Sequence, residues 1–424
     1  QKVGYETAMI GKIHLRGLPQ GFDYSAVLPG QGHYYNPDFI IDGIKKRIDG
    51  YVTSITTNLA LDWLKNKRKK DQPFLLLYHQ KAPHRNWKPE EKYLSLFDDK
   101  TFDPPANFFD DYSNRGTAAK TQEMLIAASE KQIEVAHGNG GHGRWGHDFK
   151  MLKDPYGNNT GFERELQRFS PEQKSAWLDA YTPKNEAMIS QNLEGKELAI
   201  WKFNRYIKDY LRTIQSVDDG VGEVLDYLDQ EGLTENTIVV YTSDQGFYLG
   251  EHGWFDKRFM YEESLRTPIL IRYPNEIPAG SKVDKMIQNL DFAPTFLDYA
   301  GIKKPGDMQG DSFRDIVNQK GGTWRDAIYY TYYEYPSVHM VKRHYGVRTE
   351  RYKLMHFYYD INEWELYDLE QDPSEMNNLY DNSKYSDIQK RMHLRLSELR
   401  EQYGDSDSMD QMHINRYVSS RRKK

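Results

Sequence analysis

The chain has 424 residues, enough for one large α/β domain or for a large domain with a small one. Its net charge of −6 argues against nucleic acid as a partner. The absence of cysteine excludes disulfide bonds, and no apolar run approaches the roughly 20 residues that a membrane span needs.

Helical and strand patterns alternate through the first part of the chain. Apolar residues recur every three or four positions over Tyr51–Lys67 and Tyr206–Leu228, which predicts two amphipathic helices. Runs of apolar, β-branched and aromatic residues predict buried strands at Phe74–Tyr78, from Ile238 onward and at Pro268–Arg272. This alternation predicts an α/β fold with a mostly parallel sheet and helices on both of its faces.

From about residue 320 the pattern changes. Short alternating strands with turns predict an antiparallel sheet, followed by a closing helix over Ser386–Tyr403. The predicted strands are Ala327–Tyr333, His344–Arg348, Tyr352–Tyr358 and Glu365–Leu369. We therefore expect a main domain over residues 1–320 and a small α+β subdomain over residues 321–424.

A long irregular stretch, residues 97–160, is rich in proline, glycine, asparagine and aspartate. Stretches of this kind inside compact proteins are usually functional or disordered. Its tract His137–Gly143 could bind a metal, but a flexible insertion is the favoured interpretation. The sequence assigns no role to residues 110–200.

The run Thr237–Gly246 carries the strongest chemical signal in the sequence. Its first half predicts a buried strand, which leads to Asp244 and Gln245. In open α/β sheets, ligands bind beyond the carboxyl ends of strands. Carboxylate and amide oxygens are ligands that Ca²⁺ and Mg²⁺ prefer, so this pair predicts part of a metal site.

Six segments together resemble the sulfatases of the alkaline-phosphatase-like superfamily, and their order and spacing cover nearly the whole chain. They are Gly4–Leu15, Ala82–His84, Thr237–Pro268, Asp291–Leu297, Met308–Ser312, and Gly346–Leu354 with Glu365–Leu369. The resemblance implies an alkaline-phosphatase-like fold, with residues 1–320 as the catalytic domain, and the hydrolysis of sulfate esters.

The resemblance also implies roles for four catalytic residues. Lys12 and Lys257 would hold the sulfate oxygens as positive charges. His84 would act as general acid toward the bridging oxygen, and His14 would contact the nucleophile and help to expel sulfate.

The sequence departs from the sulfatase pattern at its front. Sulfatases use a formylglycine made within a Cys/Ser-x-Pro/Ala-x-Arg segment, and place two Asp metal ligands on a strand upstream of the part that matches Gly4–Leu15. Neither occurs here, and Asp244 with Gln245, which stands where asparagine is more usual, would leave the single Ca²⁺ site incomplete. We therefore expect an N-terminally incomplete sulfatase, and we expect residues 1–424 alone to be inactive.

The wider context resembles carbohydrate sulfatases, especially the N-acetylglucosamine 6-O-sulfatase type. The segments that carry this resemblance are Gly21–Tyr24 with Pro29–Gly32 and Tyr34–Pro37, Ala82–Trp87, and Trp145–Asp148. It implies a sulfated carbohydrate as substrate, in the breakdown of glycosaminoglycans or mucin glycans by a periplasmic or secreted enzyme.

Four further residues are candidates for binding the sugar. Trp87 could stack on a sugar ring, although a tryptophan after a strand more often packs in the core. His339, Arg343 and His344 could hold hydroxyl or anionic groups, with a solvated basic patch as an equal alternative.

Two other functions stay open at the level of sequence. A phosphatase or phosphonate hydrolase of the same superfamily would often use two metals, whereas one ligand pair and two lysines favour a singly charged sulfate ester. The second alternative is an inactive glycan-binding protein, derived from a sulfatase, that has lost the N-terminal catalytic segment. One Ca²⁺ per full-length chain would separate sulfatase from the first alternative, and the upstream DNA would decide the second.

Overall fold

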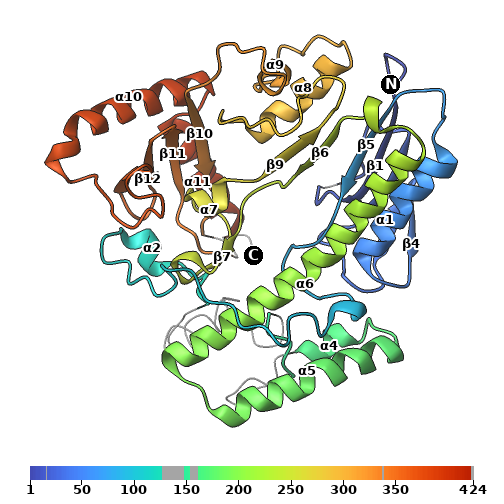
Figure 1. Ribbon diagram of the computed structural model, residues 1–424. Coiled ribbons are helices and arrows are strands. Elements are labelled where there is room, and N and C mark those ends of the chain that lie inside the picture. Colours follow the sequence, from blue (N-terminus) through green and yellow to red (C-terminus); the bar gives the residue numbers. More distant parts are fainter. Residues whose placement is uncertain (16, 127–147, 153–160, 337–338, 422–424) are drawn as a thin grey trace. The chain divides into compact units, whose positions relative to one another are not determined.

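Two compact units make up the protein in the computed structural model (Figure 1). The structure describes residues 1–15, 17–126, 148–152, 161–336 and 339–421. The tract His137–Gly143 lies outside these ranges. Unit 1 consists of Gln1–Pro104 with Gly143–Thr237, and unit 2 of Pro105–His142 with Ile238–Lys424. The domain boundary at residue 320 stays a prediction.

Unit 1 contains a five-stranded sheet in the order β4-β3-β2-β1-β5. Its strands are β1 (Glu6–Lys12), β2 (Tyr24–Leu28), β3 (Asp38–Ile41), β4 (Ile44–Arg47) and β5 (Phe74–His79). β1 runs parallel to β2 and β5, whereas β3 is antiparallel to both of its neighbours. The sheet is therefore mixed, where the sequence predicted a mostly parallel one. The turn Asp42-Gly43, with φ of 47° and 85°, joins β3 to β4 as a tight hairpin.

Helix α1 packs on this sheet through β5 and β1, and α6 packs against α1 (Figure 1). The helical segments are α1 (Val52–Asp62), η1 (Trp63–Lys67), η2 (Glu91–Tyr93), α4 (Phe162–Leu166), α5 (Pro171–Gln191), α6 (Gly195–Gln230) and η3 (Thr234–Asn236). Both predicted amphipathic helices are confirmed, although α6 begins earlier than expected. Helix α5 was not predicted, yet it begins with a capping box between Ser170 and Gln173.

Unit 2 contains a four-stranded antiparallel sheet, β10-β11-β12-β13, and α10 packs on its first three strands. Two short ribbons, β6-β9 and β7-β8, are also antiparallel. The strands are β6 (Val239–Thr242), β7 (Tyr248–Leu249), β8 (Phe255–Asp256), β9 (Ile269–Arg272), β10 (Ala327–Tyr332), β11 (His344–Thr349), β12 (Tyr352–Phe357) and β13 (Glu363–Asp368). The predicted C-terminal antiparallel sheet is confirmed.

The remaining helices of unit 2 are mostly short. They are α2 (Thr117–Thr121), η4 (Glu251–Gly253), α7 (Glu262–Leu265), η5 (Asn289–Asp291), α8 (Phe292–Tyr299), α9 (Arg314–Val317), η6 (Ser383–Tyr385), α10 (Ser386–Gln402) and α11 (Asp407–Arg421). α10 is the predicted closing helix, whereas α11 was not predicted. Among the described residues, no helix combines the length and the apolar character that crossing a bilayer requires.

Candidate functional site

Lys12 and His14 lie where β1 leaves the sheet of unit 1. Gly11 just before them has a φ of 107°, and a Cβ there would lie 1.8 Å from the carbonyl oxygen of His79 on β5. Glycine therefore permits the close pairing of the two parallel strands at this edge. Lys12 is partly buried and His14 is exposed, with its Nδ1 3.3 Å from Gln31 Nε2.

His84 follows β5, which pairs with β1 in parallel, so the segments with His14 and His84 leave the same edge of the sheet. The His84 ring is partly buried, and its Nδ1 lies 2.6 Å from the backbone oxygen of Arg85. The backbone oxygen of His84 accepts a hydrogen bond of 2.6 Å from the hydroxyl of Tyr34. Unit 1 thus holds three predicted catalytic residues at one sheet edge.

Trp87 is a core residue in this structure. Its side chain is 1% exposed, its ring contacts that of Tyr206 at a centroid distance of 4.5 Å, and Lys150 Nζ lies 5.8 Å from the ring centre. A ring buried in this way offers no face to a sugar, so sugar stacking is excluded and packing, the interpretation that the sequence favoured, accounts for Trp87.

Asp244 and Gln245 follow β6 in unit 2, as the sequence predicted. The backbone oxygen of Asp244 accepts a hydrogen bond of 2.6 Å from Asn289 Nδ2, which fixes the turn. The Gln245 amide faces the Asp244 carboxylate, and turned with its nitrogen inward it donates to the two carboxylate oxygens at 3.2 and 2.7 Å. Turned the other way, the amide oxygen lies at these same distances from the carboxylate oxygens, a close approach of oxygens that a bound cation would stabilise.

This donor set fits part of a Ca²⁺ site. Asp244 and Gln245 offer oxygens alone, but two residues supply fewer than the six or more ligands that Ca²⁺ takes. Within the residues that the structure describes, no cluster of three or more His, Cys, Asp or Glu side chains could hold a metal. A bound ion would therefore need oxygens in addition to this pair.

Lys257 lies at the exit of the β7-β8 hairpin, and its side chain is 16% exposed. Its Nζ is 3.5 Å from Asp256 Oδ1, while Arg258 Nη1 lies 2.5 Å from the other oxygen of the same carboxylate. Burial lowers the pKa of Lys257, and the carboxylates of Asp256 and Asp244 oppose this shift. Lys257 therefore lies within electrostatic range of the Asp244 carboxylate, and it shares Asp256 with Arg258.

The three candidate sugar-binding residues after β10 lie in different environments. His339 is partly buried, with its Nδ1 3.0 Å from both carboxylate oxygens of Glu334. Arg343 is 1% exposed and donates from Nε to the backbone oxygen of Tyr335. His344 is fully buried, and burial lowers its pKa to about 4. The structure thus contradicts both expectations for Arg343 and His344, sugar contact and a solvated patch. Arg343 is bound to the Tyr335 backbone, and the His344 ring packs against Phe259 and Phe357.

A buried charged network in unit 2 was not predicted. His252 is 0% exposed between Asp110, Arg115 and Glu263, and burial lowers its pKa to about 3. Burial raises the pKa of Glu263 to about 8, with a further contribution from Glu375. His252 belongs to the segment Gly250–Gly253 that resembles the sulfatases, but a single sequence does not show which polar residues become buried.

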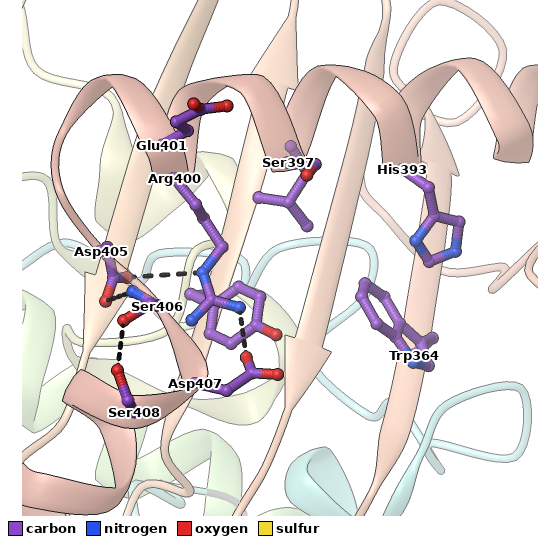
Figure 2. Close-up of a pocket in the computed structure, with 11 residues that line it drawn as sticks. Trp364, His393, Ser397, Arg400, Glu401, Asp405, Ser406, Asp407 and Ser408 are labelled. Carbon is purple, nitrogen blue, oxygen red and sulfur yellow. Dashed lines mark hydrogen bonds and ion pairs between the residues drawn. The ribbon is translucent and has the colours of Figure 1, made fainter.

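A hollow of about 610 Å³ opens beside the C-terminal helices of unit 2. Figure 2 shows Arg400 at its centre, directed toward Asp405 and Asp407, with Trp364 and His393 at the other end. Arg400 donates to Asp407 Oδ1 at 2.8 Å and to Asp410 Oδ2 at 2.7 Å. The carboxylates around the hollow outnumber its arginine, so it would repel a sulfated ligand and is not the predicted site.

The sulfatase family pattern matches residues 1–302 of the chain, which include every predicted catalytic and metal-binding residue. This chain belongs to the sulfatase family. The pattern for the C-terminal region of N-sulphoglucosamine sulphohydrolase matches residues 250–402. Sulfatases generally use Ca²⁺ and a formylglycine, although which residues of this chain serve them stays a prediction.

Individual relatives agree with this assignment. An N-acetylglucosamine-6-O-sulfatase of Bacteroides thetaiotaomicron is 48% identical over 416 residues, which cover 96% of this sulfatase and 72% of that protein. An arylsulfatase of Clostridium perfringens is 34% identical over 181 residues, which cover 42% of this chain and 36% of that protein.

A solved structure also matches, described as a complex with its substrate D-glucosamine-2-N,6-O-disulfate. It is 45% identical, with a TM-score of 0.85 over 96% of this sulfatase and 81% of that chain. The predicted alkaline-phosphatase-like α/β fold and the sulfuric ester hydrolase class are confirmed.

Proposed function

We propose that this sulfatase removes sulfate from carbohydrate, and specifically the 6-O-sulfate of N-acetylglucosamine in glycosaminoglycans or mucin glycans. The observation that carries the proposal is the 48% identity, over 96% of the chain, to a protein named N-acetylglucosamine-6-O-sulfatase. The solved structure with a 6-O-sulfated glucosamine as its substrate supports the same class of substrate. We further propose a periplasmic or secreted location, where such glycans are found.

Lys257 is the proposed sulfate-binding residue that the structure supports best. Lys257 shares the Asp256 carboxylate with Arg258, so neither cation has that carboxylate to itself at this hairpin exit. A mostly buried ammonium group interacts with an anion more strongly than a solvated one does. Lys12 would bind sulfate in the same manner, as its place at the end of β1 and its partial burial allow.

His84 and His14 would act as the acid–base residues of the reaction. His84 would protonate the leaving sugar oxygen, and His14 would contact the nucleophile and assist the release of sulfate. Asp244 and Gln245 would hold one Ca²⁺ together with further oxygen ligands, and that ion would supply positive charge to the sulfate oxygens. The formylglycine nucleophile is not assigned to any residue of this chain.

Calorimetric titration of the chain with N-acetylglucosamine 6-O-sulfate tests the proposal. The sulfated sugar should bind at least about tenfold more tightly than N-acetylglucosamine, a difference of about 1.4 kcal/mol. Lys257→Ala should remove most of this preference. Lys390→Ala, which changes a lysine that is 78% exposed on α10, should retain it.

Two results would contradict the proposal. Equal affinity for the sulfated and unsulfated sugars would exclude a sulfate site, and tighter binding of the 6-phosphate would favour the phosphatase alternative. Sulfate release, followed by ion chromatography, should be undetectable with residues 1–424 alone. Turnover that Lys257→Ala abolishes would show that the chain carries its own nucleophile.

A further inference from the structure

The backbone next to His84 determines which ring nitrogen carries a proton. Nδ1 lies 2.6 Å from the carbonyl oxygen of Arg85. A carbonyl oxygen accepts hydrogen bonds and cannot donate them, so Nδ1 must carry the hydrogen in the neutral ring and in the charged one. Nε2 is then the ring atom that gains and loses a proton.

Arg85 is itself held by a carboxylate from a distant part of unit 1. Its Nε and Nη2 donate to the two oxygens of Asp148 at 2.9 and 2.7 Å. The side chains are 12% and 3% exposed, so water competes little for this pair. A two-point contact between a planar guanidinium and a carboxylate fixes orientation as well as distance.

A second anchor lies on the other side of the same dipeptide. The Tyr34 hydroxyl donates to the carbonyl oxygen of His84 at 2.6 Å, and the Tyr34 side chain is 3% exposed. The segment His84-Arg85 is thus clamped by Tyr34 at its first carbonyl and by Asp148 at its arginine. The carbonyl that orients the ring therefore has little freedom to turn away.

We propose that Asp148 is a positioning residue that acts through Arg85 to hold His84 as its Nδ1–H tautomer, with Nε2 presented as the proton-exchanging atom. This proposal rests on the proposed function for its catalytic meaning, because Nε2 would carry the proton that the leaving sugar oxygen takes. The pair also explains why Arg85 follows the histidine. A lysine would carry the same charge but could not make both contacts.

NMR spectroscopy of the chain with ¹⁵N-labelled histidine tests the proposal without any substrate. His84→Gln assigns the ring signals, and a pH titration gives the tautomer and the pKa. In the unmodified chain, neutral His84 should carry its proton on Nδ1. Asp148→Asn should give a mixture of tautomers and should lower the pKa of His84 by about 0.5 to 1 unit, because the charged ring loses a well-placed acceptor.

Two further variants separate positioning from general loss of structure. Arg85→Lys keeps the charge without the two-point contact and should produce the same change in the ring signals. Asp98→Asn removes a carboxylate that instead pairs with Arg212, at 2.6 Å in the same unit, and should leave His84 unchanged. Urea unfolding of each variant reports whether it is folded.

Some outcomes would overturn the proposal. These are a proton on Nε2 in neutral His84 of the unmodified chain, or unchanged ring signals in both Asp148→Asn and Arg85→Lys. If the ring signals respond as expected but no sulfated sugar binds, the positioning role stands and the proposed function fails.

Discussion

His252 Nδ1 lies 3.0 Å from Asp110 Oδ2, although the two residues are 142 positions apart in the sequence. The contact ties the tip of the β7-β8 hairpin to the segment before α2. Arg115 forms an ion pair with the same aspartate, and the side chains of Asp110 and Arg115 are 2% and 1% exposed. The hairpin that ends at Lys257 is therefore anchored by a buried charge cluster and does not depend on its two short strands alone.

Loss of the Asp110 charge should destabilise unit 2 strongly. Asp110→Asn leaves the buried guanidinium of Arg115 without its anionic partner, which costs about 3 kcal/mol or more. Urea unfolding followed by tryptophan fluorescence measures this loss. Asp111→Asn is the matched control, because the neighbouring carboxylate is exposed and should contribute less than about 0.5 kcal/mol. Equal losses in both variants would show that the cluster does not stabilise the fold.

His344 should make the stability of the protein depend on pH. Burial lowers its pKa from 6.5 to about 4. Between these values the unfolded chain binds more protons than the folded one, so the free energy of unfolding rises with pH. A fall from pH 6.5 to pH 4 should therefore cost about 3 kcal/mol through this residue, and further acid should add less than about 0.5 kcal/mol from it.

His344→Phe separates this contribution from those of other groups. The ring lies against Phe259 and Phe357, at centroid distances of 5.7 and 5.1 Å, so a phenyl ring suits its surroundings. The variant loses the hydrogen bond from Nδ1 to the Lys342 oxygen, about 1 kcal/mol at every pH. Its stability should change less between pH 6.5 and pH 4 than that of the unmodified chain. The same slope in both proteins would assign the pH dependence elsewhere.

Periodicity identified those elements that a local pattern determines. The strand at Phe74 and the helices α1, α6 and α10 follow directly from runs or spacings of apolar residues. Apolar periodicity does not predict the antiparallel hairpin of β3 and β4, because its signal is the Asp42-Gly43 turn and not a run of apolar residues. Helix α11 was missed because its sequence has little apolar periodicity, so no buried stripe marks it.

The place of a site residue could be predicted from the sequence where that residue follows a predicted strand. His84 and Asp244 follow strands that the sequence predicts, so the sheet pattern predicts their place at strand ends, whereas Lys12 ends β1, a strand that was not predicted. Burial of His344 could not be predicted, since a histidine near a strand suits both a core and a ligand site, whereas for Trp87 packing in the core was already the favoured interpretation. Pairs such as Arg85 with Asp148, 63 positions apart, depend on tertiary structure and have no sequence signal.

Calcium should stabilise the protein through Asp244. If the Asp244–Gln245 pair binds Ca²⁺, a free Ca²⁺ concentration of about ten times the Kd should raise the free energy of unfolding by about 1.4 kcal/mol. Asp244→Asn should abolish the increase, and so should a chelator. Asp307→Asn, which changes an exposed carboxylate of the same unit, should retain it. Stabilisation that is the same in Asp244→Asn would place the ion at another site.

Two glycines of α6 should respond to alanine in opposite directions. A Cβ at Gly220 would lie 2.3 Å from Thr57 Oγ1 and 2.8 Å from the Tyr78 hydroxyl, where α6 approaches α1 and β5. A Cβ at Gly222, two positions further on, would meet nothing within 4 Å. Gly220→Ala should therefore destabilise the protein by about 1 to 3 kcal/mol through overpacking. Gly222→Ala should stabilise it by up to about 1 kcal/mol, because alanine favours the helix. Urea unfolding of the two variants measures both changes, and a loss of stability in Gly222→Ala would show that this face of α6 is packed.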